Sequence, residues 1–346
     1  MKRILFVLKS REAAWGYSAG SSGLSNSVRF VVDMLSQRGI EAKSVEVADN
    51  NAIDAAVTAY RPTHVIVEAF WVVPEKFDVL KTLHPTVRWL VRDHSETPFL
   101  ANEGIAFGWT IEYLRRGVEV MCNSPRARAD MRDVAAACGL PESLITYGPN
   151  FYPCPAARFI VPKPVNREAI DIGCFGAVRP LKNHMAQAIA AIAFADAARV
   201  KLRFHVNATR IEGNGDPILK NLRSLFDATP RYSLIEHDWM SHHDFLEVIR
   251  QIDVSMQVSF TETFNIVAAD AVAMSVPVLA SPELPWLGAY AHALPTSTAS
   301  MARSLMAIWN ESHAEQNARL HRQRHELIGY SQRSEDVWVG RFGPRF

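Results

Sequence analysis

Short runs of apolar residues recur along the chain, each followed by a segment with apolar residues at helical spacing. The first run is Ile4 to Leu8, and in the helix that follows it Val28, Val31 and Leu35 repeat three or four positions apart. Unbroken apolar runs are typical of parallel strands that are buried on both faces. Strands are predicted at 4–8, 43–47, 64–68, 89–92, 118–122, 170–175, 201–207, 232–236, 254–258 and 276–280, and helices at 24–38, 51–60, 75–83, 103–116, 125–138, 183–197, 217–228, 241–250 and 299–338. This alternation predicts an α/β fold with parallel sheets.

The alternation is interrupted once, at residues 151–168, which contain four prolines. Proline disfavours both helix and central strand, so this stretch reads as a linker. A chain of 346 residues is also longer than most single hydrophobic cores. We therefore expect two Rossmann-like doubly wound domains facing a central cleft, at 1–155 and 169–325, with a linker at 156–168.

Composition and charge indicate which classes of protein the chain can belong to. Apolar residues make up 48% and charged residues 21%, and the net charge is +1. Neither half is a polycation, so bulk charge gives no sign of a nucleic-acid or membrane protein. No window approaches the ~20 apolar residues that span a bilayer, and the apolar run after Met1 is too short for a secretory signal. The four cysteines have no metal-ligand spacing, which favours free thiols in the cytoplasm.

The segment from Ser259 to Ser281 carries the clearest chemistry. Glu262 and Asp270 stand eight positions apart, around the predicted start of an Ala-rich helix, with Glu262 at its N-terminus and Asp270 about two turns in. Free N–H groups at a helix start suit a phosphate, and carboxylates suit sugar hydroxyls. The alternative is an ordinary helix capped by Thr261 or Thr263, with two solvated acids.

A second motif follows the strand 170–175. Gly176 ends the strand, and Arg179 and Lys182 stand three apart before the next helix. Arginine offers a forked pair of donors and lysine a point charge, so together they suit a diphosphate. The alternative is a solvated loop with two surface cations.

Together the two motifs resemble those of retaining GT-B glycosyltransferases of the family-4 type, over nearly the whole chain and most strongly in 172–184 and 255–281. The segment resembles that family's E-x7-E signature, with Asp270 in place of the second glutamate, Thr263-Phe264-Asn265 in place of a glycine-flanked turn and Ser275 in place of a glycine. Ser18 to Gly23 is similar to the family's N-terminal glycine loop, which approaches the donor diphosphate.

The resemblance implies a role for each matching position. Glu262 would contact the transferred sugar and Asp270 the nucleoside ribose, and the C-terminal segment 326–346, with Trp338 and Phe342, would return to the N-terminal domain. The donor would be a nucleoside-diphosphate sugar, such as a UDP-sugar, with no further cofactor. The remaining donor contacts would come from Gly20, Ser22, Gly23, Gly176, Arg179, Lys182, Thr263, Phe264, Asn265 and Ile266.

Among the histidines, His94 is the strongest candidate. It follows the strand 89–92, and in the resembling family a histidine at this place contacts the sugar near the reacting carbon. Neutral histidine can polarise a hydroxyl or pass a proton. Asp93 and Glu96 are weaker candidates. His242-His243-Asp244 is interpreted as a solvated helix cap, and the absence of any Asp-x-Asp pair predicts an enzyme that needs no metal.

The acceptor is left open between classes. The stretch from Glu68 to Pro74 resembles phage glycosyltransferases, some of which modify hydroxymethylated pyrimidines in DNA, so DNA in a host cytoplasm is one hypothesis. The alternatives are a cell-envelope or small-molecule acceptor, a sugar-nucleotide epimerase, and a non-catalytic sugar-nucleotide binder. The sequence does not indicate the oligomeric state.

Overall fold

The computed structural model describes residues 2–10, 23–154 and 168–344. These form two compact units, one from Met1–Pro153 and Ser331–Phe346, the other from Cys154–Tyr330. We describe each unit by itself. Most of the predicted linker lies outside the described residues, as do Gly20 and Ser22 of the predicted glycine loop. No helix in the described ranges combines the length and apolarity needed to cross a bilayer.

Unit 1 is built on a parallel sheet of six strands in the order β2-β1-β3-β4-β5-β6. The strands are β1 (Arg3–Lys9), β2 (Glu41–Val47), β3 (His64–Glu68), β4 (Arg88–Asp93), β5 (Glu119–Cys122) and β6 (Ile145–Tyr147). The helices are α2 (Gly23–Gln37), α3 (Ala52–Tyr60), α4 (Lys76–Leu83), α5 (Thr97–Leu100), α6 (Ala106–Arg115) and α7 (Pro125–Ala137), with a 3-10 turn η1 at Glu142–Leu144. The order reverses between β1 and β3, which in such sheets marks where ligands bind.

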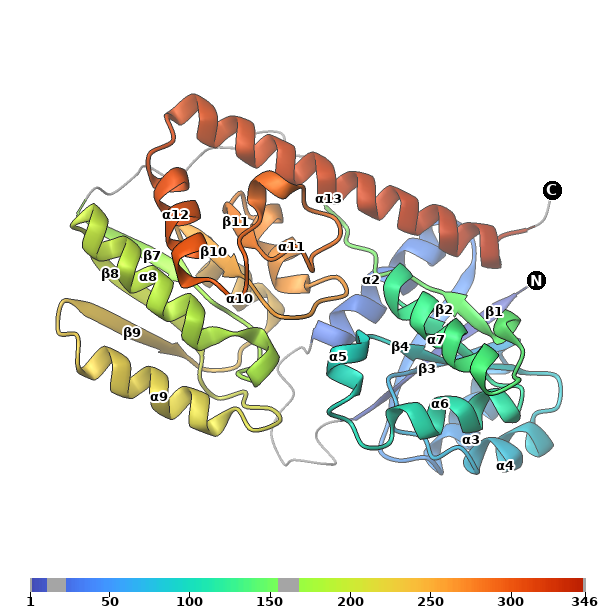
Figure 1. Ribbon diagram of the computed structural model, residues 1–346. Helices are drawn as coiled ribbons and strands as arrows, with labels where there is room; N and C mark the ends of the chain where they lie inside the picture. The colour runs from blue at the N-terminus through green and yellow to red at the C-terminus, as the bar shows by residue number, and fades with distance from the viewer. Residues whose placement is uncertain (1, 11–22, 155–167, 345–346) are drawn as a thin grey trace. The chain divides into compact units, whose positions relative to one another are not determined.

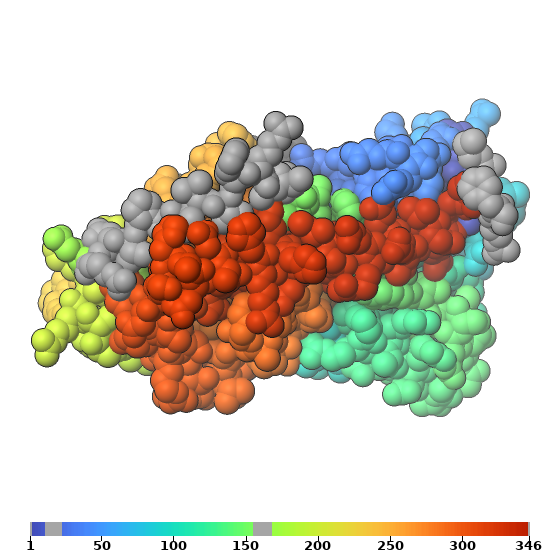
Figure 2. All heavy atoms as spheres, turned by 90° about the horizontal axis from the view of Figure 1, so that it is seen from above, coloured from blue at the N-terminus to red at the C-terminus, as the bar shows by residue number. Residues whose placement is uncertain are grey.

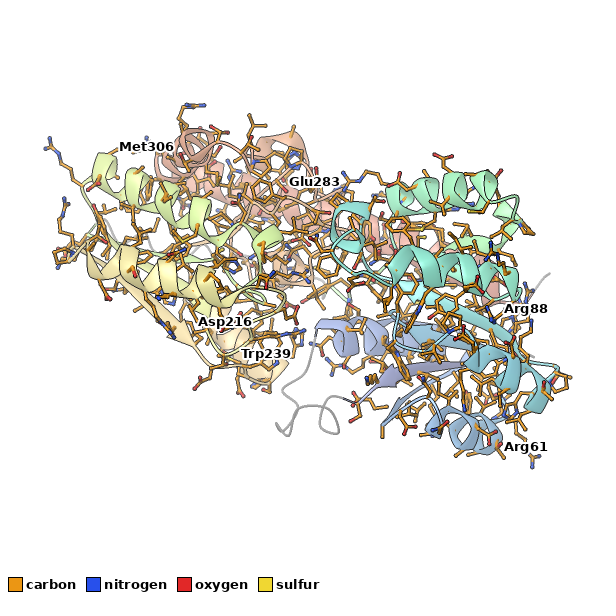
Figure 3. All side chains as sticks on the ribbon, turned by 60° about the horizontal axis from the view of Figure 1, so that its bottom comes forward. Arg61, Arg88, Asp216, Trp239, Glu283 and Met306 are labelled. Carbon is orange, nitrogen blue, oxygen red and sulfur yellow. The ribbon has the colours of Figure 1, made fainter. Side chains whose placement is uncertain are left out.

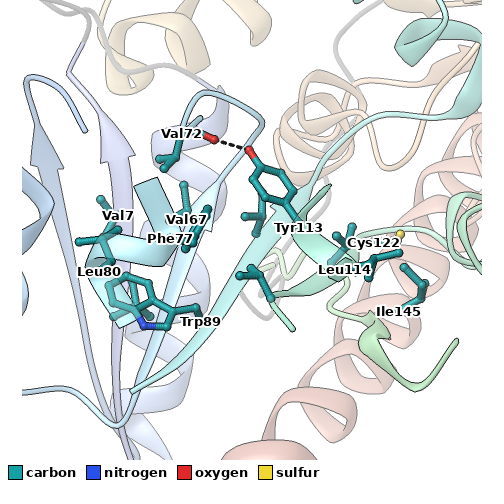
Figure 4. Close-up of a cluster of buried hydrophobic side chains, with 14 of the residues drawn as sticks. Val7, Val67, Val72, Phe77, Leu80, Trp89, Tyr113, Leu114, Cys122 and Ile145 are labelled. Atoms are coloured by element: carbon teal, nitrogen blue, oxygen red, sulfur yellow. Dashed lines mark hydrogen bonds between the residues drawn. The ribbon is translucent and has the colours of Figure 1, made fainter. Parts of the chain in front are cut away.

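Alternate residues of each central strand face opposite sides of this sheet. In β1, Leu5 and Val7 join one buried cluster, and Ile4, Phe6 and Leu8 join the other. Burying one such side chain is worth about 1.5–3 kcal/mol. Figure 4 shows the first cluster, in which the Tyr113 hydroxyl donates a hydrogen bond to the backbone carbonyl of Val72. Burial on both faces explains why these strands appear as unbroken apolar runs in the sequence.

Unit 2 holds a second parallel sheet, in the order β11-β10-β7-β8-β9. Its strands are β7 (Ala169–Gly173), β8 (Lys201–Asn207), β9 (Tyr232–His237), β10 (Val254–Gln257) and β11 (Val278–Ala280). Its helices are α8 (His184–Ala198), α9 (Asp216–Asp227), α10 (His242–Ile249), α11 (Ile266–Ala273) and α12 (Thr298–Trp309), with 3-10 turns η2 (Pro180–Lys182) and η3 (Ala289–Ala291). The order reverses between β7 and β10, so the loops after these two strands meet at one edge.

The last helix, α13 (His313–Phe342), is continuous, and its residues from Ser331 onward belong to unit 1 (Figure 1). Trp338 is buried there, packs on Phe6 at 5.9 Å between ring centroids and donates Nε1–H to the Pro149 carbonyl at 2.8 Å. Phe342 stacks on Trp338. Figure 2 shows the outer side of α13 at the molecular surface, with N-terminal elements beside its last turns.

The two sheets confirm the predicted α/β architecture, with local corrections. The expected helix 299–338 is two helices, because Asn310 ends α12 and α13 begins at His313. The strand expected at 276–280 starts only at Val278, because Ser275 adopts a left-handed φ of 62° and Pro277 has no N–H to donate. Strand β6 and the short helix α5 were not predicted.

Candidate functional site

The loop after β7 starts at a glycine that the backbone requires. Gly176 has a φ of 114°, a conformation that side chains rarely adopt, and its N–H donates to Asn207 Oδ1 at 2.9 Å. The chain then turns through η2, and Asn183 (φ 60°) leads into α8. This path places Lys182 at the end of the turn, beside the loop that follows β10.

Lys182 and Glu262 form an ion pair between these two loops. Lys182 Nζ donates to Glu262 Oε1, and the two side chains are only 13% and 7% exposed. A nearly buried cation and anion stabilise each other because little water screens them. The structure thus brings together two residues that lie 80 positions apart, at the edge where the strand order reverses.

Asn265 organises the turn between Glu262 and α11. It has a left-handed φ of 59°, which asparagine tolerates better than most residues, and its Oδ1 accepts from Ala268 N at 3.0 Å as the helix cap. Its Nδ2 donates to Gln257 Oε1 at 2.9 Å and to Glu262 Oε1 at 3.0 Å. The cap is therefore Asn265, which corrects the alternative with Thr261 or Thr263 in that role.

Thr263, Phe264 and Ile266 flank this cap. The Phe264 side chain is 1% exposed and stacks on Tyr330 at 5.3 Å, and Trp286 Nε1 donates to the Phe264 carbonyl at 2.7 Å. Its ring is therefore part of the core, which leaves only its backbone amide for the predicted ligand contact. Thr263 is also buried, and Ile266 is the first residue of α11.

Asp270 is the fifth residue of α11, a little over one turn in, rather than about two turns in as expected, because the helix begins only after Asn265. Its carboxylate is almost fully buried, and Oδ1 bonds to His242 Nε2 at 2.8 Å. His242 begins α10 behind the true cap, Ser241, whose hydroxyl accepts from Asp244 N at 3.2 Å. The solvated-cap interpretation is therefore wrong for His242, although His243 and Asp244 are exposed.

Arg179 lies one residue before η2 and contacts a different loop. Its Nη1 is 3.5 Å from Glu212 Oε2, and Arg210 Nε donates to the same carboxylate at 2.7 Å. Arg210 also lies over the Trp239 ring, at 4.3 Å from the centroid, and Figure 3 labels Trp239 on the segment after β9. The alternative of a solvated loop with two surface cations is therefore wrong, because Arg179 and Lys182 each have an acidic partner, on different loops.

In unit 1, His94 lies immediately after β4 and bonds to a glutamate on the neighbouring strand. Its Nε2 bonds to Oε2 of Glu68, the last residue of β3, and the Glu68 side chain is fully buried. Desolvation lowers the pKa of His94, although the Glu68 charge acts against this shift. The neutral imidazole is therefore favoured, and Glu68 fixes which ring nitrogen holds the proton. Glu68 was not among the site residues predicted from the sequence.

Arg92 is the second charged partner of Glu68 and also binds the segment Gly148 to Asn150. It is fully buried and donates to the carbonyls of Gly148 at 3.0 Å and Pro149 at 2.9 Å, and to Asn150 Oδ1 at 2.7 Å. Its Nη1 lies 3.6 Å from Glu68 Oε1. Glu68 is thus held between Arg92 and His94, and this contact keeps the imidazole in a fixed position.

Asp93 and Glu96, the weaker candidates, have structural partners. Asp93 Oδ1 accepts from Ser95 N at 3.0 Å, and Glu96 Oε1 accepts from the Ser124 hydroxyl at 2.6 Å. Burial raises the pKa of Asp93 to about 8. Gly23, the one member of the predicted glycine loop that is described, is the first residue of α2.

Replacing Asp93 by asparagine is expected to flatten the pH dependence of stability. The native carboxyl holds its proton up to about pH 8, whereas the unfolded one releases it near pH 4, so this group costs stability as pH rises between these values. D93N is neutral throughout and retains the acceptor for Ser95 N. Its free energy of unfolding should therefore exceed that of the wild type at pH 8 by more than at pH 5. Equal differences in urea titrations at the two pH values would contradict this.

Two surface cavities in unit 1, of about 570 and 730 Å³, lie away from these residues. Both are lined by Ser143, Thr146 and Arg341, near the ends of strands opposite to His94. Neither includes a predicted site residue. The four cysteines are free thiols, of which Cys122 and Cys174 are buried, Cys154 is partly buried and Cys138 is exposed.

No family model matches the chain, and no curated protein matches it. Solved structures do match it over nearly its whole length. A trehalose-phosphate synthase (UDP-forming) from Burkholderia vietnamiensis is 12% identical with a TM-score of 0.68, covering 99% of this chain and 96% of its own. The sucrose-phosphate synthase of Thermosynechococcus elongatus is 14% identical with a TM-score of 0.67, covering 98% of both.

A third match is HepE of Anabaena, solved in complex with UDP and glucose. It is 12% identical with a TM-score of 0.63, and the match covers 98% of this chain and 100% of that one. At such identities the likeness establishes the fold alone. The protein has the GT-B fold, two Rossmann-like α/β units, as the sequence predicted.

Proposed function

We propose that the protein is a retaining glycosyltransferase that takes its sugar from a nucleoside-diphosphate sugar. The observation that carries this proposal is the Lys182–Glu262 pair beside the start of α11, at the reversal point of the second sheet. A cation for a diphosphate and a carboxylate for sugar hydroxyls are thereby held next to the N-terminal end of α11, where backbone amides favour anions. Each of these groups suits one part of a sugar nucleotide.

The roles divide along the donor. Lys182 and Arg179 offset the diphosphate charge, aided by the backbone amides of Thr263 to Ile266. Glu262 accepts hydrogen bonds from the sugar, and Asp270 from the ribose. Glu262 and Asp270 are both buried, and the scarcity of water around them strengthens such contacts.

In unit 1, His94 is proposed to contact the sugar near the reacting carbon. Glu68 holds its ring, and the lowered pKa of His94 keeps the imidazole neutral at physiological pH. A neutral ring can polarise a hydroxyl or pass a proton. The proposal needs no covalent nucleophile, and the sugar keeps its anomeric configuration.

The comparisons support a UDP-sugar as donor. HepE is solved with UDP and glucose, and the trehalose-phosphate synthase is UDP-forming. We extend this donor class to the present protein as part of the proposal.

Thermal unfolding with a panel of sugar nucleotides tests the donor. A true donor at 100 times its dissociation constant stabilises the protein by about 2.7 kcal/mol. Because Lys182 and Arg179 offset the diphosphate, the shift and the donor turnover should persist in EDTA. If EDTA abolishes both the thermal shift and the turnover, and Mg²⁺ restores them, a metal ion binds the diphosphate instead.

The acceptor is proposed from sequence resemblance. Hydroxymethylated DNA incubated with the best donor should gain the mass of one sugar per modified base, and binding should weaken steeply with salt. If duplex DNA neither binds at low salt nor gains mass, a cell-envelope or small-molecule acceptor takes its place. If the enzyme consumes the donor without an acceptor and releases an isomer, it is an epimerase. If it binds the donor without any turnover, it is a non-catalytic binder.

A further inference from the structure

His242 and Asp270 form a pair that joins the start of α10 to the middle of α11. His242 Nε2 and Asp270 Oδ1 are 2.8 Å apart, and the side chains are 15% and 2% exposed. The next two residues of α10, His243 and Asp244, are exposed. Of the two adjacent histidines, only His242 is therefore turned toward α11.

The position of His242 is fixed by its own helix start. Ser241 caps α10 through Asp244 N, and its hydroxyl also donates to Asp244 Oδ2 at 2.7 Å. A capped first turn leaves the backbone of His242 little freedom. The imidazole is thus held at one place relative to α11.

Asp270 is a buried acid within an apolar stretch of α11. Its neighbours on α11, Ala268, Ala269, Ala271 and Val272, are all at most 3% exposed. A buried carboxylate without hydrogen bonds is unfavourable, and a bond from an imidazole N–H offsets this cost. The bond from His242 to one oxygen restricts the orientations that the Asp270 carboxylate can adopt.

We propose that His242 is a positioning residue of the nucleoside subsite: it orients Asp270 toward the ribose hydroxyls and so sets the preference for ribonucleotides over 2′-deoxyribonucleotides. This inference rests on the proposed function, in which Asp270 contacts the ribose. An aspartate has only one methylene between its backbone and its carboxylate. Its reach therefore depends on its rotamer, which the bond to His242 selects.

Three substitutions separate the hydrogen bond from the ring. H242Q places an amide N–H near the position of Nε2, H242N carries its amide closer to the backbone, and H242F keeps an aromatic ring without a donor. H243F is the matched control, since it makes the same change one residue later at an exposed site. All four are compared with the wild type by thermal unfolding first.

Calorimetric titration with UDP and 2′-deoxy-UDP gives the readout. The wild type should bind UDP about 10- to 100-fold more tightly than 2′-deoxy-UDP, as expected for a hydrogen bond to a charged group. H242F should lose most of this ratio by weakening UDP binding alone, and H242Q should recover it. H243F should match the wild type. In turnover, H242F should raise KM for the donor with little change in kcat.

The outcomes distinguish the inference from the function it rests on. If the wild type binds UDP and H242F retains the same preference as H243F, the inference is wrong and the proposed function stands. If the wild type binds neither nucleotide, both fail for a UDP donor. If H242F does not fold, the comparison of H242Q with H242N decides, and equal preference in these two variants overturns the inference.

Discussion

Replacing Glu262 by alanine is expected to abolish donor turnover, lowering it by about 10²–10⁴-fold. Glu262 joins the Lys182 side chain to the turn before α11, and it accepts from both Lys182 Nζ and Asn265 Nδ2. E262A removes the proposed sugar contact and also leaves Lys182 nearly buried without its counter-charge. We expect the free energy of unfolding to fall as well, by up to about 3 kcal/mol.

The two effects can be separated. E262Q keeps an oxygen acceptor for Asn265 but lacks the charge, so it should lose activity with a smaller loss of stability than E262A. Adding K182M to E262A removes the unpaired cation and should restore stability while turnover stays absent. Initial rates of sugar-nucleotide hydrolysis and urea titrations measure the two quantities. An E262A variant that folds and turns over donor at the wild-type rate would exclude Glu262 from the site.

Replacing Arg92 by methionine is expected to be the most destabilising single change in unit 1, by about 3–5 kcal/mol. Arg92 is 0% exposed and supplies three hydrogen bonds to the segment Gly148 to Asn150. Its guanidinium also lies 5.2 Å from the Trp338 ring centroid. R92M leaves the buried Glu68 without its cation and removes the Arg92 donors from the Gly148 and Pro149 carbonyls, of which Pro149 keeps the bond from Trp338.

The lysine variant provides the control for charge. R92K keeps a cation near Glu68 but cannot supply forked donors to Gly148 and Pro149, so its stability should lie between wild type and R92M. Urea titration followed by Trp fluorescence measures this. R92K equal to wild type would show that charge alone matters, and R92M equal to wild type would mean that the buried network contributes nothing.

The fold could be predicted from the sequence because the strands are buried on both faces. Runs such as Ile4–Leu8 and Val65–Val67 need no partner to be recognised, and the helices between them follow from spacing. Strand β6 was missed because Ile145–Tyr147 has one fully buried residue and two partly buried ones, so its pattern is weak. Helix α5 was missed because four residues are too few for a period.

The candidate site was predictable only where its residues stand in local sequence motifs. Gly176, Lys182 and Glu262 stand in local motifs at strand ends, and the strand order then brings them together. Glu68 and His242 could not be assigned a role in this way, because their partners lie 26 and 28 positions away in the chain. Only the folded structure shows which polar side chain fills the space beside a buried ring or carboxylate.

The continuous helix α13 makes unit 1 discontinuous in sequence, because Trp338 and Phe342 complete a core that begins at Ile4. A ribosome therefore starts unit 1 first and finishes it last, after the whole of unit 2 has emerged. A chain cut after Pro153 would lack Trp338 and Phe342 and would therefore expose Phe6 and the apolar face around it. A synthetic peptide spanning 331–346 should bind that face in trans, and until these residues are synthesised the face lacks the cover that α13 provides.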